Sequence, residues 1–282
     1  MYPKVERWLK ENKLGCIIEK KPLSGGCISH ASRLTLDSGR TFVLKINQQA
    51  PVNMFEEESR GLAALSERQT IKTPAVICAD QKFILLEDLG SGQPNDSYWT
   101  NLGENLANLH NKPVRQFGFL TDNYCGNTLQ ENTVTENGFK FFRDYRIINL
   151  CSKAFNSNLL ENQDLKHLEY IAANLSRWIP EQEPVLIHGD LWRGNVHCDT
   201  SGNPALIDPA VYWGWPEAEL AMTKLFGGFE REFYESYESC SNISNDWYSR
   251  APLYNLYHLL NHLILFGGNY LMQIRESIKK FV

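Results

Sequence analysis

Two short apolar runs late in the chain, each followed at once by polar residues, constrain the fold more than any other feature. The first run ends at Ile187 and leads into His188-Gly189-Asp190, and Asn195 follows five residues after the aspartate. The second run ends at Ile207 and leads into Asp208. Short apolar runs that stop at polar clusters are typical of buried strands. We therefore predict two strands whose ends present these polar side chains.

The spacing of Asp190 and Asn195 indicates phosphoryl transfer. In the catalytic loop of kinases, H-x-D-x-x-x-x-N, the Asp accepts the proton of the substrate hydroxyl and the Asn binds a metal ion. Asp208 would complete the metal site, because Mg²⁺ prefers carboxylate, carbonyl and phosphate oxygens. The alternative is a plain turn between strands, with Asp190 in an Asx-turn and Asn195 as a polar loop residue. The combination of His-Gly-Asp, an asparagine at the kinase spacing and a second aspartate after a strand is far more specific than His-Gly-Asp alone. The plain turn is therefore the weaker alternative.

The composition argues against two classes of partner. The chain has 282 residues, enough for one or two domains with a sizeable core. Its net charge of −5 argues against a nucleic-acid binder that relies on a basic surface. No signal peptide is visible, and the longest apolar stretch, residues 256–266, is too short and too polar to span a membrane. Seven scattered cysteines without a C-x-x-C pair indicate reduced thiols, so we expect a cytoplasmic protein.

The N-terminal third reads as strands around a glycine loop. Strand-like runs at residues 16–23, 31–36 and 41–46 are separated by a loop that contains Gly25-Gly26 and by a turn at residues 37–39; the third run carries Lys45. In a nucleotide kinase, such a loop covers the phosphates and a strand lysine binds them. Paired glycines are often only turns. The order of the elements favours nucleotide binding here, by Gly25, Gly26 and Lys45.

The next segment predicts a helix with an acidic residue on its inner face. Phe55, Leu62 and Leu65 lie on one side of this helix, and Glu58 shares that side. An inward carboxylate is costly unless it is paired, and Lys45 is the obvious partner. The alternative is that Glu58 lies at the edge of the apolar stripe and reaches solvent. A capping box that starts at residue 53 is expected to begin the helix.

A break after residues 83–89 divides the chain into two parts. The apolar run 83–86 reads as a strand, and the glycines and proline of residues 90–94 end it. The order of elements makes this break a hinge, where Glu87 and Leu89 would contact adenine. Apolar spacing beyond residue 96 is helical. We predict an α+β chain with an N-terminal nucleotide-binding lobe (1–88), a hinge (89–94) and a mostly helical C-terminal catalytic and substrate lobe (95–282).

The motif around Asp190 resembles that of the fructosamine/ketosamine-3-kinase family, which belongs to the protein-kinase-like group with the aminoglycoside and choline kinases. The segment from His188 to Asn195 reads H-G-D-L-W-R-G-N, and Asp208 begins D-P-A-V-Y-W-G. The resemblance also covers the following positions: Gly25-Gly26, Lys45, Phe55-x-x-Glu58, Phe117-Gly118, Asp122-Asn123, Gly126, Phe141-Phe142, Arg146, Glu217, Leu220-Ala221-Met222 and Phe266-Gly267-Gly268. It implies a two-lobed protein-kinase-like fold, with one main helix in a small β-rich lobe.

The resemblance also implies an activity, which is ATP-dependent phosphorylation of the 3-hydroxyl of sugars attached to amines by Amadori chemistry. The phosphorylated adduct is unstable and frees the amine, a repair of glycation. By this resemblance Asp190 is the base, Asn195 and Asp208 bind Mg²⁺, Lys45 binds phosphates and Glu58 orients Lys45. The substrate would be a small-molecule or protein-bound ketosamine.

Departures from the family pattern and a group of aromatic residues bear on substrate preference. Glu219 stands where the family usually has Asp, and Trp215-Pro216 stands where charged residues are more common. Aromatic residues crowd the two strands, and their faces could pack against a sugar or equally form core. The candidate substrate contacts are His188, Trp192, Tyr212 and Trp213.

Three other functions remain open at this stage. The first is a related kinase that acts on an aminoglycoside, choline or a free sugar. The second is a nucleotide-binding pseudokinase, although every expected catalytic position is filled. The third is a metal-dependent hydrolase that uses His188, Asp190 and Asp208, but it would leave Lys45 and Glu58 without a role.

Cys27 follows the glycine pair directly and is a candidate redox site. Neighbouring backbone N–H groups would favour its thiolate and raise its reactivity. We predict reversible loss of activity on mild oxidation, through a disulfide between two chains, in a protein that is otherwise a monomer or weak homodimer. The alternative is that Cys27 only fills a small apolar gap, as free cysteines often do.

Overall fold

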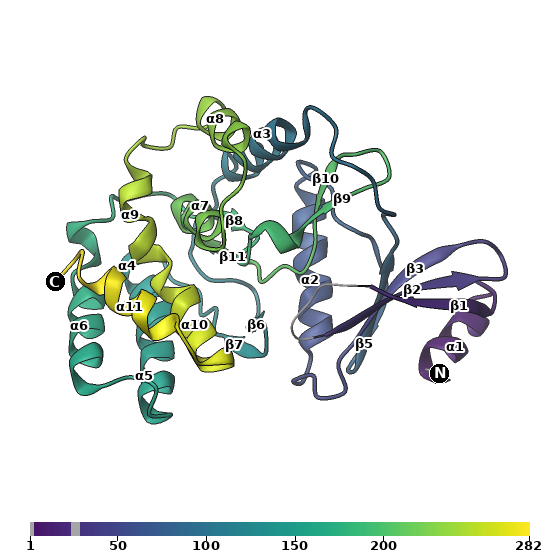
Figure 1. Cartoon of the computed structure of the whole chain (residues 1–282), viewed down its shortest axis with the longest axis horizontal. Helices are drawn as coiled ribbons and strands as arrows, with labels where there is room; N and C mark the ends of the chain where they lie inside the picture. Colours follow the sequence, from purple (N-terminus) through teal and green to yellow (C-terminus); the bar gives the residue numbers. More distant parts are fainter. Residues whose placement is uncertain (1–2, 24–28) are drawn as a thin grey trace.

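A five-stranded antiparallel sheet forms the N-terminal part of the computed structural model, which describes residues 3–23 and 29–282 (Figure 1). Its strand order is β1-β2-β3-β5-β4. Neighbours in this order pair antiparallel, and Lys45 lies opposite Ala31 on one side and Ile84 on the other. The strands are β1 (Ile17–Pro22), β2 (His30–Leu36), β3 (Thr41–Ile46), β4 (Val76–Asp80) and β5 (Phe83–Glu87).

One helix packs on each face of this sheet. On one face, Leu34, Leu44 and Leu85 form a buried cluster with α1 (Pro3–Glu11). On the other face, Ile84 and Leu86 pack with residues of α2 (Met54–Glu67). Successive side chains of a strand point to opposite faces. Lys45 follows Leu44 and is therefore directed toward α2.

Helix α2 begins without the predicted capping box, and that prediction is wrong. Asn53 has a left-handed backbone, with φ of 63°, and its side chain makes no cap hydrogen bond. N-cap residues normally have an extended backbone that lets the side chain reach the amides of the first turn. The predicted inner face is correct, because Phe55, Leu62 and Leu65 are buried.

The rest of the chain is mostly helical, with three short two-stranded ribbons inserted (Figure 1). The ribbons pair β6 (Asn123–Cys125) with β7 (Thr128–Gln130), β8 (Val185–Ile187) with β11 (Tyr212–Gly214), and β9 (Val196–Cys198) with β10 (Pro204–Leu206). The helices are α3 (Tyr98–His110), α4 (Gly138–Phe141), a π-helix (Phe142–Ile148), α5 (Asn149–Asn156), α6 (Asn162–Ala173), α7 (Pro216–Leu225), α8 (Arg231–Ser239), α9 (Trp247–Tyr254), α10 (Leu256–Phe266) and α11 (Tyr270–Ile278). No helix within residues 3–23 or 29–282 has the length and apolar character that a bilayer span requires.

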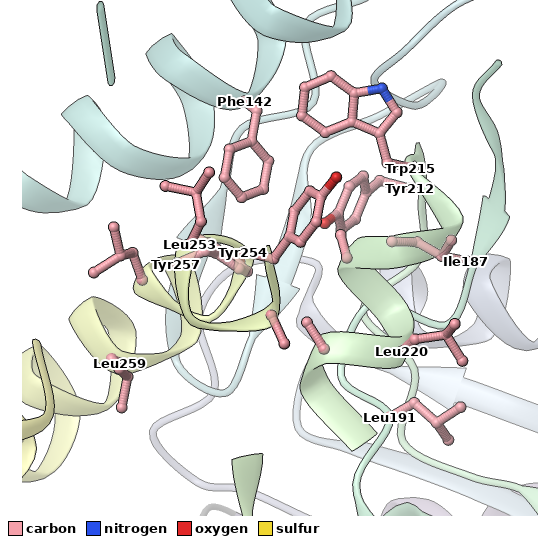
Figure 2. Close-up of a cluster of buried hydrophobic side chains, with 14 of the residues drawn as sticks. Phe142, Ile187, Leu191, Tyr212, Trp215, Leu220, Leu253, Tyr254, Tyr257 and Leu259 are labelled. Carbon is pink, nitrogen blue, oxygen red and sulfur yellow. The ribbon is translucent and has the colours of Figure 1, made fainter. Parts of the chain in front are cut away.

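The largest apolar core lies beneath the β8–β11 ribbon. Figure 2 shows Tyr212 and Trp215 from the region of β11 beside Tyr254 and Tyr257 of the late helices and Leu220 of α7. All three residues of β8 are buried, so packing in the core fixes the position of the strand end from which the next residues continue.

Several side-chain and backbone contacts join the two parts. The connection from β5 to α3 is held at Leu89, whose carbonyl accepts the N–H of Thr200 at 3.1 Å. On α2, Glu57 is buried and accepts a hydrogen bond from Thr121 at 2.5 Å. Lys72 forms an ion pair with Asp199 at 2.8 Å. The sheet-containing part and the mostly helical part are therefore placed against each other by specific polar contacts.

Candidate active site

A buried cation lies between two carboxylates at the junction of the two parts. The Nζ atom of Lys45 is 2.6 Å from Oε1 of Glu58 and 2.7 Å from Oδ1 of Asp208. Burial alone would lower the pKa of Lys45, but both carboxylates raise it and the net shift is upward, so the amine stays charged. The Glu58 side chain is only 9% exposed, which rules out the alternative that it reaches solvent. The predicted pairing of Lys45 with Glu58 is confirmed.

Hydrogen bonds between two loops bring Asp190, Asn195 and Asp208 into one place. The carbonyl of His188 accepts the N–H of Ala210 at 2.9 Å, and the carbonyl of Asn195 accepts the N–H of Ile207 at 3.1 Å. The His188 ring adds a third link, because its Nε2 is 2.9 Å from the carbonyl of Ile207. The loop after β8 and the loop after β10 therefore form one unit.

The His188 ring is a neutral structural group. A carbonyl can only accept, so Nε2 carries the proton, and Nδ1 accepts the N–H of Asp190 at 3.3 Å. Burial lowers the pKa of His188, although Glu219 opposes this shift. A neutral imidazole with both nitrogens occupied fixes the path of the chain just before Asp190.

Backbone conformation explains two residues of the motif. Gly189 has φ of +81°, and a Cβ atom there would lie 2.0 Å from the carbonyl oxygen of Ala210, so only glycine allows this close approach. Asp208 also has a left-handed backbone, with φ of 57°. That conformation costs a non-glycine residue about 1–3 kcal/mol and is often found at functional sites.

The Asp190 carboxyl group is held by Asn195 and has an unusual affinity for protons. The Nδ2 atom of Asn195 donates to the Asp190 carbonyl at 2.7 Å and to its Oδ2 at 3.2 Å. Burial raises the pKa of Asp190 to about 8; the Asn195 hydrogen bond opposes the shift, and the charges of Asp208 and Glu219 add to it. This carboxyl group therefore gains and loses its proton close to neutral pH.

Glu219 holds the Asp190 loop in place, a role that the sequence did not reveal. Its carboxylate accepts the N–H of His188 at 2.5 Å and the N–H of Gly189 at 3.0 Å, and it is 1% exposed. The His110 Nε2 atom lies 3.6 Å away. Glu219 stands in α7 between Ala218 and Leu220, both buried. An acidic residue inside an apolar helical run was the available signal, because such a charge must be satisfied.

Comparisons with known proteins agree with this geometry. All 282 residues match the family model for fructosamine kinase. The chain is 37% identical over 273 residues to a protein of Synechocystis sp. described as a probable ketoamine kinase, covering 94% of this chain and 90% of that one. It is 34% identical over 279 residues to the chloroplastic protein-ribulosamine 3-kinase of Oryza sativa subsp. indica, covering 94% and 80%.

The chain belongs to the fructosamine kinase family.

Solved structures confirm the predicted α+β, protein-kinase-like fold. A Thermobifida fusca protein assigned as a fructosamine-3-kinase superposes with a TM-score of 0.89 at 26% identity, covering 99% of both chains. A macrolide 2'-phosphotransferase has a TM-score of 0.67 at 16% identity and covers 99% of this chain and 96% of that one, a likeness that concerns the fold alone. Fructosamine kinases thus share their architecture with phosphotransferases that are much more distant in sequence.

Two of the four candidate substrate contacts in this fructosamine kinase family member are inaccessible. His188 is 0% exposed and Tyr212 is 2% exposed. Tyr212 lies within the cluster of buried side chains in Figure 2. The Tyr212 ring packs under the guanidinium of Arg146, 4.0 Å from its centroid. Direct substrate contact by His188 and Tyr212 is therefore a wrong prediction, because both side chains lie inside the protein. Trp192 and Trp213 remain partly exposed.

The predicted adenine segment has a backbone N–H group left for a ligand at Leu89. The N–H of Glu87 donates to the carbonyl of Ala75 at 2.8 Å, and its carboxylate accepts the Ala75 N–H at 3.0 Å. The Leu89 carbonyl is bonded to Thr200, whereas its N–H has no hydrogen bond to any residue that the structure describes. Gly25, Gly26 and Cys27 lie outside the described residues.

Proposed function

We propose that this chain is an ATP-dependent kinase that phosphorylates the 3-hydroxyl of ketosamines. The observation that carries the proposal is the contact of Lys45 with both Glu58 and Asp208, next to the Asp190 carboxyl group. Relatives described as ketoamine and ribulosamine kinases support ketosamines as the acceptor class. Both small-molecule and protein-bound ketosamines fit this class.

In this proposal Asp190 is the general base. Its pKa of about 8 suits removal of a proton from a hydroxyl group as that group attacks phosphorus. Asn195 fixes the rotation of the carboxylate, and Glu219 fixes the loop that carries it. Trp192 and Trp213, both partly exposed, are the aromatic surfaces proposed for the sugar.

The nucleotide would lie between the two parts, with its phosphates at Lys45. Glu58 orients the lysine, as the strand-lysine to helix-glutamate pair does in kinases. Gly25 and Gly26 are proposed to cover the phosphates, and the N–H of Leu89 to bind adenine; Glu87 lies beside it. In this assignment residues 1–88 are the nucleotide-binding lobe, 89–94 the hinge and 95–282 the catalytic lobe.

The donor set at Asn195 and Asp208 fits Mg²⁺. The Asn195 amide nitrogen is already bonded to Asp190, so its amide oxygen remains for an ion, and Asp208 adds a carboxylate. Hard oxygen donors of this kind are those that Mg²⁺ prefers. Bound there, Mg²⁺ would supply positive charge that stabilises the phosphate oxygens. The pairing of Lys45 with Asp208 would then give way to contacts with the phosphates.

ATP consumption measured over a panel of acceptors tests this function. Ribulosyl-lysine and fructosyl-lysine are compared with an aminoglycoside, choline and free sugars. We expect turnover with a ketosamine and the phosphate on its 3-hydroxyl. Turnover only with another acceptor would identify a different small-molecule kinase, and no turnover with any acceptor would indicate a pseudokinase.

The variant Asp190→Asn tests the assigned base. Loss of a general base typically lowers the rate by about 10²–10⁴-fold, while nucleotide binding should persist because Lys45 and Leu89 are unchanged. The kcat is measured with the preferred ketosamine, and nucleotide affinity by calorimetry. Wild-type turnover in the variant would refute the assignment.

A further inference from the structure

Three side chains with metal-binding chemistry meet at the catalytic carboxylate. Cys125, Asp190 and His258 each contribute one ligand-type atom, and these atoms all lie within 4.8 Å of one another. They come from the end of β6, from the loop after β8 and from α10. The proposed phosphoryl transfer uses Asp190 but gives no role to Cys125 or His258.

One hydrogen bond joins two of the three elements, and another orients the Asp190 carboxyl group. The Nδ2 atom of Asn261 donates to the Cys125 carbonyl at 3.1 Å and so ties α10 to β6. His258 lies three residues before Asn261 and therefore shares its face of the helix. Asn195 bonds one carboxylate oxygen of Asp190, and the other oxygen has no hydrogen bond to a described residue. The cluster is thus built into the scaffold.

One buried polar atom of the cluster lacks a hydrogen-bond partner in the part of the chain that the structure describes. His258 is 4% exposed, and its Nδ1 has no hydrogen-bond partner among the residues that the structure describes. Cys125 is 3% exposed. A buried polar atom left unpaired costs about 1–3 kcal/mol and needs an explanation. A bound ion would give the imidazole a partner.

We propose that Cys125, Asp190 and His258 bind a transition metal ion such as Zn²⁺, and that this ion blocks catalysis by occupying the general base. The second half rests on the proposed function, and the first half does not. Thiolate, imidazole and carboxylate are the usual Zn²⁺ ligands, and three of them leave a fourth position for water. The two metal sites differ in kind, because Asn195 and Asp208 offer only oxygen donors, which suit Mg²⁺.

Metal binding releases a proton from each ligand that is protonated beforehand. The Cys125 thiol loses its proton to solvent and binds as the thiolate; a proton on Asp190 is released in the same way. His258 binds through an imidazole nitrogen that carries no proton. No electron transfer takes place, and removal of the ion by a chelator restores the protonated thiol and the free carboxylate.

Titration of the purified chain with Co²⁺, a spectroscopic substitute for Zn²⁺, tests the site directly. A thiolate bound to Co²⁺ adds a near-ultraviolet absorption band, and a four-coordinate ion gives intense visible bands. We expect both signals to saturate at one equivalent and Zn²⁺ to abolish them. Absence of the thiolate band in the wild-type chain would overturn the proposal.

Single substitutions identify the ligands. Cys125→Ser should remove the thiolate band, and His258→Gln and Asp190→Asn should each weaken Zn²⁺ binding by more than the roughly 10–100-fold that loss of an outer partner costs. Cys240→Ser changes an exposed cysteine and is the matched control. Thermal unfolding checks that each variant is folded. An unchanged band in Cys125→Ser, or equal loss in Cys240→Ser, would refute the assignment.

Competition between Mg²⁺ and Co²⁺ distinguishes the two metal sites, and inhibition by Zn²⁺ tests the blocking role separately from the kinase function. A large excess of Mg²⁺ should leave the thiolate band intact; displacement of Co²⁺ by Mg²⁺ would place the ion at Asn195 and Asp208 and refute the proposal. Zn²⁺ should inhibit phosphoryl transfer reversibly, and Cys125→Ser should shift that inhibition to at least about tenfold higher Zn²⁺. Unshifted inhibition would overturn the blocking role. Failure of the kinase function would appear in the acceptor panel instead, since the absorption spectrum needs no turnover.

Discussion

Opposing interactions determine the pKa of the Asp190 carboxyl group, and so the pH at which it can accept a proton. Its carboxyl group is removed from water, which disfavours its charge, while Asn195 donates a hydrogen bond that favours it. The carboxylates of Asp208 and Glu219 add negative charge nearby. The balance puts its pKa at about 8, well above that of an ordinary aspartate. The pH of the solution should therefore control the proposed base directly.

Catalytic efficiency should rise with pH through about 8, the pKa of Asp190, because only the deprotonated form accepts a proton. The kcat/KM for the acceptor, measured from neutral to alkaline pH, reports this pKa in the free enzyme. A flat profile would contradict the assignment.

The raised pKa of Asp190 also makes folding stability depend on pH. Stability should fall as the pH rises, whereas catalytic efficiency should rise. The folded chain keeps the Asp190 proton up to pH 8 or so, whereas the unfolded chain loses it near about 3.9. Wild-type stability from this group is therefore lost as the pH rises between the two values. Asp190→Asn, which cannot ionise, should gain stability relative to wild type across that interval, measured by urea unfolding.

Glu219→Gln should impair the catalytic loop. The glutamine cannot accept both N–H groups that the carboxylate accepts, and a hydrogen bond to a charged group is worth about 1.5–3 kcal/mol. We expect lower stability and a lower kcat, with the KM for ATP nearly unchanged because the two N–H groups that Glu219 accepts belong to the Asp190 loop and not to the proposed nucleotide site. Glu219→Asp, which retains both acceptor oxygens, should recover part of the kcat. A Gln variant with wild-type kcat would show that the loop needs no such anchor.

At the residue scale, the sequence predicted site residues that lie at a fixed spacing within one segment. It missed residues whose role depends on which distant segment they are buried against. Asp190 and Asn195 are five positions apart in one loop, so their meeting follows from local geometry. Glu219 and His258 reach the site from helices far along the chain, and no local pattern shows which backbone atoms they face. The burial of Tyr212 was equally invisible, since an aromatic residue near a site can contact either sugar or core.

Elements with clear periodicity were predicted well. Helical spacing placed Glu58 on the inner face of α2, and an inward carboxylate predicted Lys45 as its partner, which the contact at 2.6 Å confirms. The predicted strand 41–46 coincides with β3. Features without such patterns were missed, among them strand β4 and the π-helical geometry of Phe142–Ile148, which depend on packing that no short segment encodes.

Lys45→Met and Glu58→Ala should give nearly the same defect, because the lysine needs its partner to stay directed at the phosphates. In a double-mutant cycle on kcat/KM for ATP, we expect a coupling energy of about 0.5–3 kcal/mol. Glu56→Ala, an exposed position on the same helix, is the control and should add independently to Lys45→Met. If the effects of Lys45→Met and Glu58→Ala on kcat/KM were fully additive, the contact between the two residues would not contribute to catalysis.

The two parts of the molecule share one proposed nucleotide site. Lys45 and Glu58 come from the sheet and α2, whereas Asp208 comes from the mostly helical part, so the ion pair of Lys45 with Asp208 crosses between the two parts. The contacts of Leu89 with Thr200 and of Glu57 with Thr121 reinforce this junction. A ligand bound at the junction is therefore linked to the folding of both parts.

Mg-ATP should raise the unfolding temperature of the whole molecule in a single transition. A ligand at 100 times its Kd stabilises the folded state by about 2.7 kcal/mol, which corresponds to roughly 5–10 °C for a chain of this size. Differential scanning calorimetry with and without Mg-ATP measures the shift, and Mg²⁺ alone is the control. Asp208→Asn, which weakens the proposed metal site, should reduce it. Two separate transitions, of which only one moves with Mg-ATP, would show that the nucleotide binds one part alone and that the junction around Lys45 does not form a shared site.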